Sequence, residues 1–189
     1  MTEAKSITIL IEAAKRGDSI AANELWTSVY DEIRAIAKRA IDKEYVPDSV
    51  QATELANEAY LRLAGNAVLG IENLSHLLAT VATAIRRLLV DRARARKADK
   101  RGGELVRVLL DDVIDSVESD LPDLLDLDQA LIALESIDPR HAKRIELRYF
   151  GGMTLEEAAG VLEVSTRTAA GDWALAKAWL RRRLGESDS

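Results

Sequence analysis

The chain has 189 residues, of which 48% are hydrophobic and 31% are charged, a composition typical of a soluble globular protein with one domain or two small ones. It has no cysteine and only two histidines, which excludes disulfides and cysteine chemistry and argues against a histidine-built catalytic or zinc site. The sequence contains neither an apolar run long enough to cross a membrane nor a signal peptide. We therefore expect a cytoplasmic protein that makes no membrane contact.

Charge is distributed unevenly along the chain. The formal net charge is -6, which argues against indiscriminate nucleic-acid binding because an anionic protein and anionic phosphates repel each other. Acidic residues concentrate at residues 111–128, whereas basic residues concentrate at 86–107 and 177–183. Two basic zones separated by an acidic segment can bind DNA locally despite the acidic total.

Helical spacing of apolar residues predicts three helices in the first third of the chain. Gly17 is placed to end the first helix, and Asp18 or Ser19 can cap the second. A proline-containing loop is expected over residues 42–50. The third helix is predicted at about residues 52–64, where the apolar spacing resumes.

The fourth helix has the clearest pattern. Asn73 or Ser75 can cap it, and apolar residues keep the core spacing as far as Leu89. Past Val90 the apolar stripe stops and DRARARKADKRGG follows, so we expect the helix to project from its bundle as a basic, solvated rod. The helix dipole favours one or two cations at a C-terminus, but it does not explain a longer series. These cations are Arg86, Arg87, Arg92, Arg94, Arg96, Lys97, Lys100 and Arg101.

Residues 104–122 differ in character from the helices before them. They are acidic, contain Pro122 and lack a helical period, which predicts a linker between two domains. The apolar run at residues 105–110 could form a strand or dock on a neighbouring element.

Helical spacing returns after this linker. Residues 123–137 are expected to form one helix, since leucines recur along one side. Asp138 and Pro139 supply a cap and a first-turn proline for the next helix. That helix is expected to end near Gly151 and Gly152.

Residues 154–184 contain a helix-turn-helix candidate. Thr154 followed three residues later by Glu157 is a capping-box pattern, and Ser165 is a good N-cap for a second, longer helix. A short helix, a three-residue turn and a longer helix with a polar start are typical of DNA-binding pairs, although an ordinary helical hairpin is the alternative. The expected apolar stripe of the second helix is Ala169, Trp173, Ala176, Leu180 and Leu184.

Taken together, these blocks resemble an extracytoplasmic-function (ECF) sigma factor of bacterial RNA polymerase. The resemblance is carried by SVQATELANEAYLRL, LLATVATAIRRLLVDRARARKADKRGG and LDQALIALESIDPRHAKRIELRYFGGMTLEEAAGVLEVSTRTAAGDWALAKAWL. The last two segments look especially like a planctomycete-type subgroup. The resemblance implies an all-α fold with sigma domain two at residues 1–103, an acidic linker at 104–122 and sigma domain four at 123–185.

The resemblance also implies a role for each block of the first domain. The helix over residues 53–63 would dock on the clamp helices of core polymerase, with Glu54, Glu58 and Arg62 on one face. A solvated helix face is the alternative explanation for these three residues. The eight cations of the fourth helix would help to open the minus-ten element and hold its non-template strand, because cations follow phosphates.

In the second domain, the resemblance implies that the longer helix of the pair reads the minus-thirty-five element. Its first residues would contact phosphates and base edges, with further contacts to the DNA backbone from Lys177. The contacting residues at its start would be Ser165, Thr166, Arg167 and Thr168. The implied partners are core RNA polymerase, through its clamp helices and flap, promoter DNA, and an anti-sigma factor.

Some residues depart from the family pattern. Glu163 stands at the turn where the family usually has glycine, and a non-glycine residue in a left-handed conformation costs about 1 kcal/mol. Ala169 offers less buried surface than the usual β-branched residue, and Ala170 and Gly171 replace residues that are often basic. These departures predict weaker reading of the minus-thirty-five element.

Two other functions compete with a promoter-specificity subunit. A stand-alone repressor or activator would use only the C-terminal helix pair and bind palindromic sites as a dimer. A polymerase-binding interaction protein would keep the polymerase contact but have weakened DNA reading. An enzyme finds no support, because no catalytic constellation or glycine-rich phosphate loop can be assembled, and we expect no metal and no cofactor.

Overall fold

Capping side chains decide where the helices begin. In the computed structural model, Asp18 accepts hydrogen bonds from the backbone N–H groups of Ile20 and Ala21, at 2.9 and 3.1 Å. Asn73 accepts one from the backbone N–H of His76 at 2.9 Å. Asp18 and Asn73 are therefore the N-caps of their helices, because their oxygens satisfy backbone donors that have no partner within the first turn.

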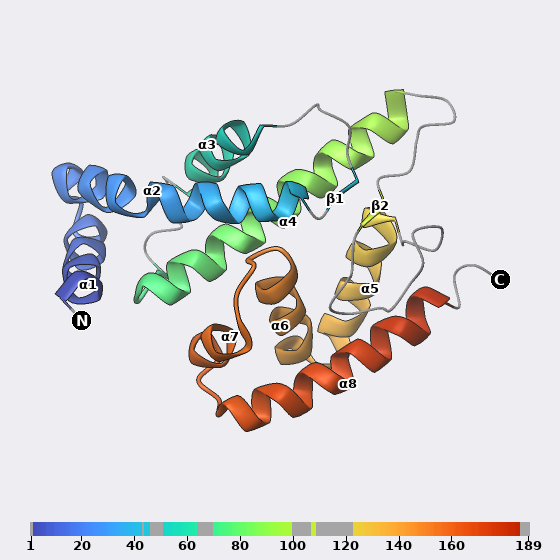
Figure 1. Ribbon diagram of the computed structural model, residues 1–189. Helices are drawn as coiled ribbons and strands as arrows, with labels where there is room; N and C mark the ends of the chain where they lie inside the picture. Colours follow the sequence, from blue (N-terminus) through green and yellow to red (C-terminus); the bar gives the residue numbers. More distant parts are fainter. Residues whose placement is uncertain are drawn as a thin grey trace.

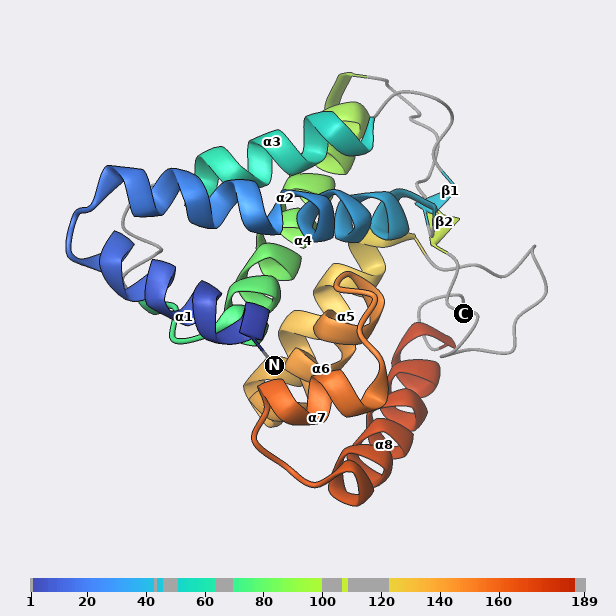
Figure 2. The same ribbon diagram turned by 60° about the vertical axis from the view of Figure 1, so that its left-hand side comes forward.

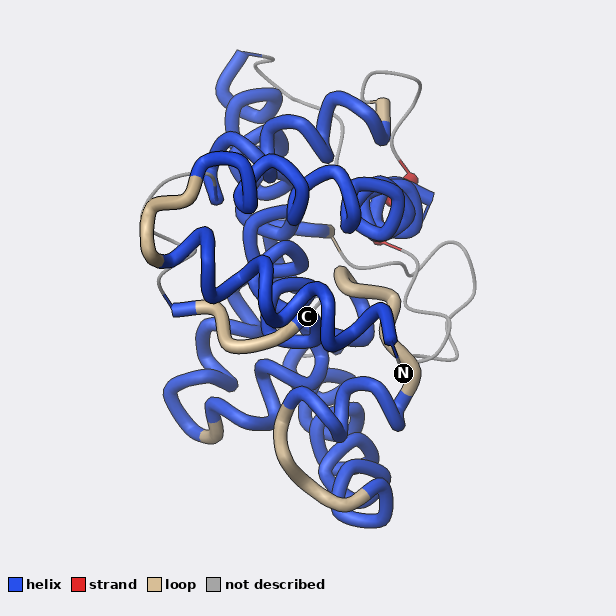
Figure 3. Tube along the Cα trace, turned by 90° about the vertical axis from the view of Figure 1, so that its left-hand side faces the viewer, coloured by secondary structure: helices blue, strands red, loops and turns tan. Residues whose placement is uncertain are grey.

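The structure describes residues 2–42, 44–45, 51–63, 70–99, 107–108 and 123–185. Almost all of this described chain is helical (Figure 3). The helices are α1 (Thr2–Lys15), α2 (Ser19–Asp42), α3 (Ala52–Leu63), α4 (Leu74–Asp99), α5 (Leu124–Ile137), α6 (Pro139–Tyr149), α7 (Leu155–Val161) and α8 (Thr166–Gly185). None of them is both long and apolar enough to span a bilayer.

The predicted all-α fold is confirmed, with one small addition. The two-residue strands β1 (Glu44–Tyr45) and β2 (Arg107–Val108) pair antiparallel. The strand considered for residues 105–110 is thus present over two residues, and the rest of the predicted linker lies outside the described residues. The limits of the two domains stay a prediction.

Helix α4 is the element that connects the two groups of helices. It packs against α2 and α3 of the N-terminal group and against α5, α6 and α7 of the C-terminal group (Figures 1 and 2). One cluster of buried side chains runs continuously from Ile7 in α1 to Leu184 in α8. The two groups therefore share a core in this structure.

The turn between α6 and α7 strengthens this contact between the groups. Gly152 has a φ of 62°, a left-handed conformation that glycine adopts without strain. A Cβ atom at Gly152 would also collide with the side chain of Arg39 on α2. The Arg39 guanidinium donates a hydrogen bond to the carbonyl oxygen of Gly151 at 3.2 Å, so the predicted Gly-Gly helix end is also where α2 meets the C-terminal group.

Candidate nucleic-acid interface

The basic face of α4 is less exposed than its sequence predicts. Of the predicted cations, Lys100 and Arg101 lie outside the described residues. The expectation that the helix projects as a solvated rod past Val90 is wrong for the first turns that follow, because Ala93 is only 3% exposed. In the structure, Arg87, Arg94 and Lys97 are exposed, Arg92 and Arg96 are half-buried, and Arg86 is buried.

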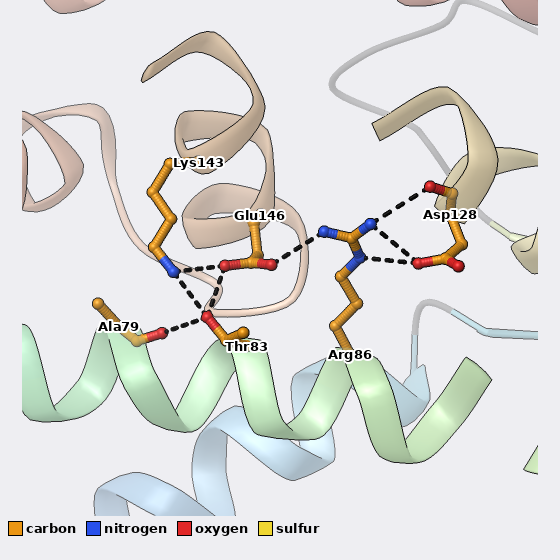
Figure 4. A network of polar contacts seen from close by, with 6 residues as sticks. All are labelled: Ala79, Thr83, Arg86, Asp128, Lys143 and Glu146. Carbon is orange, nitrogen blue, oxygen red and sulfur yellow. Dashed lines mark hydrogen bonds and ion pairs between the residues drawn. The ribbon is translucent and has the colours of Figure 1, made fainter. Parts of the chain in front are cut away.

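Arg86 is held between carboxylates from two other helices. Its guanidinium donates to Asp128 on α5 from Nη2 at 2.9 Å and from Nε at 3.1 Å, and to Glu146 on α6 from Nη1 at 3.0 Å (Figure 4). These three residues are 9%, 6% and 5% exposed. Arg86 therefore forms a buried, multiply bonded ion pair, and in this arrangement it is not accessible to DNA.

The network extends to both sides of Arg86. The Lys143 ammonium contacts Glu146 at 2.5 Å and the Thr83 hydroxyl at 2.6 Å, and that hydroxyl donates to Glu146 at 2.6 Å (Figure 4). On the other side, exposed Arg94 donates to the second carboxylate oxygen of Asp128 at 3.1 Å. We name these six side chains the α4 clamp: Thr83, Arg86, Arg94, Asp128, Lys143 and Glu146.

The charge state of Glu146 reflects these partners. Burial acts to raise the pKa of its carboxyl group, because desolvation disfavours the ionised form. The Lys143 ammonium, hydrogen bonds from Lys143 and Thr83, and the Arg86 guanidinium outweigh burial and hold the pKa below its ordinary value. Glu146 is thus an ionised, buried carboxylate.

Ion pairs also join α3 to α4. The Arg92 guanidinium contacts Glu54 at 3.0 Å and Glu58 at 3.1 Å, and Arg62 contacts Asp91 at 3.0 Å. The three residues predicted to bind polymerase therefore lie beside the helix predicted to bind DNA, and two of them are paired with one of its predicted DNA-binding cations.

An exposed leucine lies one helical turn beyond these carboxylates. Leu61 is 70% exposed and lies on the same face of α3, at positions i+7 and i+3 from Glu54 and Glu58. The sequence analysis did not select it, although a signal was present. Leu61 lies two positions before buried Leu63 and therefore on a different face of α3.

The helix-turn-helix has the predicted capping geometry. The Thr154 hydroxyl accepts from the backbone N–H of Glu157 at 3.2 Å, and the Glu157 carboxylate accepts from the backbone N–H of Thr154 at 2.7 Å, which completes the capping box. The Ser165 hydroxyl accepts from the backbone N–H of Thr168 at 3.0 Å and so caps α8. Glu163 in the turn has a φ of 53°, as its place in the pattern predicts.

The first turn of α8 faces solvent. Thr166, Arg167 and Thr168 are exposed, so this turn can approach a groove of DNA. Further along the exposed side lie Ala170 and Gly171, and nothing lies within 4 Å of a Cβ built at Gly171. This face therefore presents few groups able to form hydrogen bonds with bases.

Trp173 packs at the surface beside two cations. The guanidinium of Arg148 lies 4.4 Å from the centre of its ring, and the ammonium of Lys177 lies 5.8 Å from it. Trp173 is half-buried, and Asp172 takes the buried place beside Ala169 that the predicted stripe gave to the tryptophan. Lys177, predicted to touch the DNA backbone, is thus partly engaged by an aromatic face.

A buried arginine on α6 contacts the first turns of α8. The side chain of Arg144 on α6 is 0% exposed and contacts the Asp172 carboxylate at 3.1 Å. It also donates to the carbonyl oxygens of Thr168 and Ala169, at 3.3 and 2.6 Å. The start of α8 is therefore fixed to α6 by a charge and by its own backbone.

Sequence reasoning missed the carboxylates of the α4 clamp, although a signal was present. Asp128 follows Leu124 at i+4 and precedes Leu131 at i+3, so it lies on the buried stripe of α5. Glu146 likewise follows the buried residue Ala142 at i+4 and so lies on the buried stripe of α6. A carboxylate on a buried stripe needs a cationic partner, and Arg86 was not considered because it was assigned to DNA.

This arrangement is suited to binding anions and to protein contact. Cations from α3, α4 and α6 line its grooves together with carboxylates. The described residues contain no group of three or more histidine, aspartate or glutamate side chains that could hold a metal ion. Guanidinium and ammonium groups of this kind bind phosphates.

The chain matches a known protein family over most of its length. The family described as "ECF sigma factor" matches residues 4–186. No curated protein matches the chain in a sequence comparison. Among solved structures, the chain is similar to the sigma factor RpoE in its complex with the anti-sigma factor NepR from Bartonella quintana, at 19% identity and a TM-score of 0.39, over 86% of this chain and 96% of that chain. Because the family match spans nearly the whole sequence, the chain belongs to the ECF sigma factor family, whose members direct core RNA polymerase to promoters.

Proposed function

We propose that this sigma factor uses three helices for three contacts. Helix α3 docks on the clamp helices of core polymerase, α4 holds promoter DNA at the minus-ten element, and the start of α8 contacts the minus-thirty-five element. The first two contacts belong to a domain at residues 1–103 and the third to a domain at 123–185. The observation that carries the proposal is the pairing of Arg92 with Glu54 and Glu58, because it places the docking face of α3 directly beside the basic face of α4.

The docking contact rests on the exposed face of α3. The side chains of Glu54 and Glu58 are 56% and 43% exposed, so both retain free surface beside Arg92. Leu61 adds an apolar group to the same face. Carboxylates around one apolar anchor suit a helical partner that has a small pocket and a basic rim.

The DNA contacts rest mainly on α4. Arg87 and Lys97 are exposed and can bind phosphates in the structure as it stands. On α8, Arg167 is an exposed cation within the first turn, whereas Ala170 and Gly171 offer little to a base edge. We infer that minus-ten contacts contribute more to promoter opening than minus-thirty-five contacts.

The proposal includes finer points that rest on sequence alone. The series Leu88, Leu89, Val90 and Asp91 followed by arginines supports the planctomycete-type subgroup. The chain would act in the cytoplasm, with an anti-sigma factor as a further partner, and would supply recognition while the polymerase supplies the chemistry.

The direct test combines the protein with core RNA polymerase and candidate promoters. We expect a stable complex with core polymerase and promoter-dependent strand opening. The permanganate reactivity of unpaired thymines measures the opening. Alanine at both Arg87 and Lys97 should reduce opening more than alanine at Arg167. Unchanged strand opening in these variants would contradict the assignment of the DNA-binding residues. A wild-type protein that neither binds core polymerase nor opens promoters would contradict the function.

A second candidate is a polymerase-binding protein with weakened DNA reading. It is favoured by the engagement of Arg86, Arg92 and Arg94 with carboxylates, which reduces the free positive charge of α4. Binding to duplex and forked DNA at several salt concentrations, with and without core, separates the two candidates. The second candidate predicts that only the core contact survives.

A further inference from the structure

The α4 clamp joins the proposed DNA-binding helix to the second domain through the same groups that would bind DNA. Arg86 and Arg94 both donate to Asp128, which uses both of its carboxylate oxygens, and Arg86 also donates to Glu146. A carboxylate that accepts from two guanidinium groups presents the same chemistry as a DNA phosphate, namely anionic oxygens at hydrogen-bond distance.

The centre of the clamp, formed by Arg86, Asp128 and Glu146, is buried, whereas Arg94 pairs with Asp128 from the surface. Asp128 lies between the buried residues Leu127 and Leu131 on the stripe of α5, and Glu146 lies between Ile145 and Leu147 on α6. Because both carboxylates are desolvated, each is stable only while a cation faces it. Helices α5 and α6 therefore favour the arrangement in which α4 covers them.

The clamp also leaves a route by which DNA can compete. A groove of about 490 Å³ opens beside it, lined by the cations Arg87, Arg94 and Lys143 and also by the carboxylates Asp91 and Glu135. A phosphate that entered this groove would meet cations already present at the edge of the clamp. Separation of α4 from α5 and α6 would then expose Arg86 to the nucleic acid.

We propose that Asp128 and Glu146 form a phosphate-mimicking surface that occupies α4 in the free protein and is displaced when the sigma factor engages polymerase and promoter. The inference rests on the proposed function, in which α4 binds promoter DNA. It assigns to α5 and α6 a role in preventing DNA binding by the free subunit.

The first experiment measures binding of forked minus-ten DNA to the free protein. The variant Asp128→Asn with Glu146→Gln removes both mimicking charges. The matched control is Asp126→Asn with Glu156→Gln, which makes the same change in net charge at exposed carboxylates of α5 and α7 that do not line the groove. We expect the first variant to bind about tenfold more tightly than wild type and the control to change affinity less than about twofold, because release of the clamp raises the fraction of competent protein.

A second experiment does not depend on that variant being folded. The chain has no cysteine, so Asn23→Cys in α2 with Ala178→Cys in α8 can carry a pair of fluorescent labels at exposed positions of the two groups. Energy transfer between the labels should be high in the free protein and should fall when core polymerase and forked DNA are added. Unchanged transfer in a complex that opens promoters would overturn the proposal.

The outcomes separate this inference from the proposed function. If the wild type opens promoters with core but the clamp variant binds DNA no more tightly than the matched control, the phosphate-mimicking surface is wrong and the sigma function stands. If the wild type binds neither core nor promoter, both are wrong.

Discussion

The guanidinium of Arg144 on α6 donates a hydrogen bond of 2.6 Å to the backbone carbonyl oxygen of Ala169 on α8. This bond reaches the helix backbone directly behind the exposed residues Arg167 and Thr168. Because Arg144 is fully buried and also pairs with Asp172, the start of α8 cannot rotate relative to α6 without leaving a buried charge unpaired.

Replacement of this arginine should therefore destabilise the second domain strongly. We expect Arg144→Met to reduce the free energy of unfolding by about 3–5 kcal/mol, measured by urea denaturation followed by circular dichroism. Arg140 is a matched control, because it also contacts the Asp172 carboxylate at 3.1 Å but has a side chain that is 49% exposed. Arg140→Gln should cost less than about 1 kcal/mol, since solvent screens an exposed pair. Equal costs would show that burial does not set the strength of the Arg144 contact.

The turn of the helix-turn-helix offers a stabilising substitution. Glu163 adopts a φ of 53°, a conformation that strains residues with a Cβ atom. Glu163→Gly should raise the free energy of unfolding by about 1 kcal/mol. Glu156→Gly, at an exposed position inside α7, should lower it by a similar amount because glycine weakens a helix interior. Thermal denaturation of the two variants should give shifts of opposite sign, and a lowered midpoint for Glu163→Gly would contradict the strain.

The lowered pKa of Glu146 predicts that the stability of the folded protein decreases in acid. Its pKa is lowered from the ordinary value of 4.5, so folding favours the ionised carboxylate. The stability from this group is complete above that value and is lost as the pH falls through the lowered pKa. We expect the free energy of unfolding to fall as the pH drops below 4.5, with a smaller slope in Glu146→Gln than in wild type. Parallel curves for the two proteins would show that Glu146 does not contribute to the acid transition.

Leu61 tests the docking face. We expect Leu61→Ser to weaken binding to core polymerase by about tenfold, since an apolar anchor at an interface contributes on the order of 1–2 kcal/mol. Ile20→Ser is the matched control, because Ile20 is also 70% exposed but lies at the start of α2. Fluorescence titration with labelled core should show a loss only for Leu61→Ser. A similar loss for both variants would indicate a general effect of surface hydrophobicity.

Much of the local structure could be predicted from sequence because it depends on neighbours along the chain. The caps at Asp18 and Asn73 were among the alternatives that the sequence left open, and the capping box at Thr154 was predicted outright. The left-handed Glu163 was implied by the resemblance, because the family usually has glycine at this turn. In each case the deciding interaction spans only a few residues.

The contacts of the charged residues could not be predicted in the same way. Arg86 and Arg87 are adjacent and chemically identical, yet one is buried between two carboxylates and the other is exposed. Asp172, which the sequence did not single out, is buried against Arg144, whereas Trp173 of the predicted stripe is only half-buried at the edge of the core. The sequence shows where charged residues lie along the chain, but it does not show which of their side chains contact each other.

The sequence alone determined the helices of the described residues and the order of the basic helix and the helix-turn-helix, because helical periodicity and capping are local properties. The resemblance of three of its segments indicated the family. Only the tertiary structure decided that α4 packs against α5 and α6 and that Arg86 pairs with Asp128 and Glu146. The partners in that pairing lie 42 and 60 residues away along the chain. The strength of a buried ion pair depends on distance and desolvation, and both are set by how the helices pack.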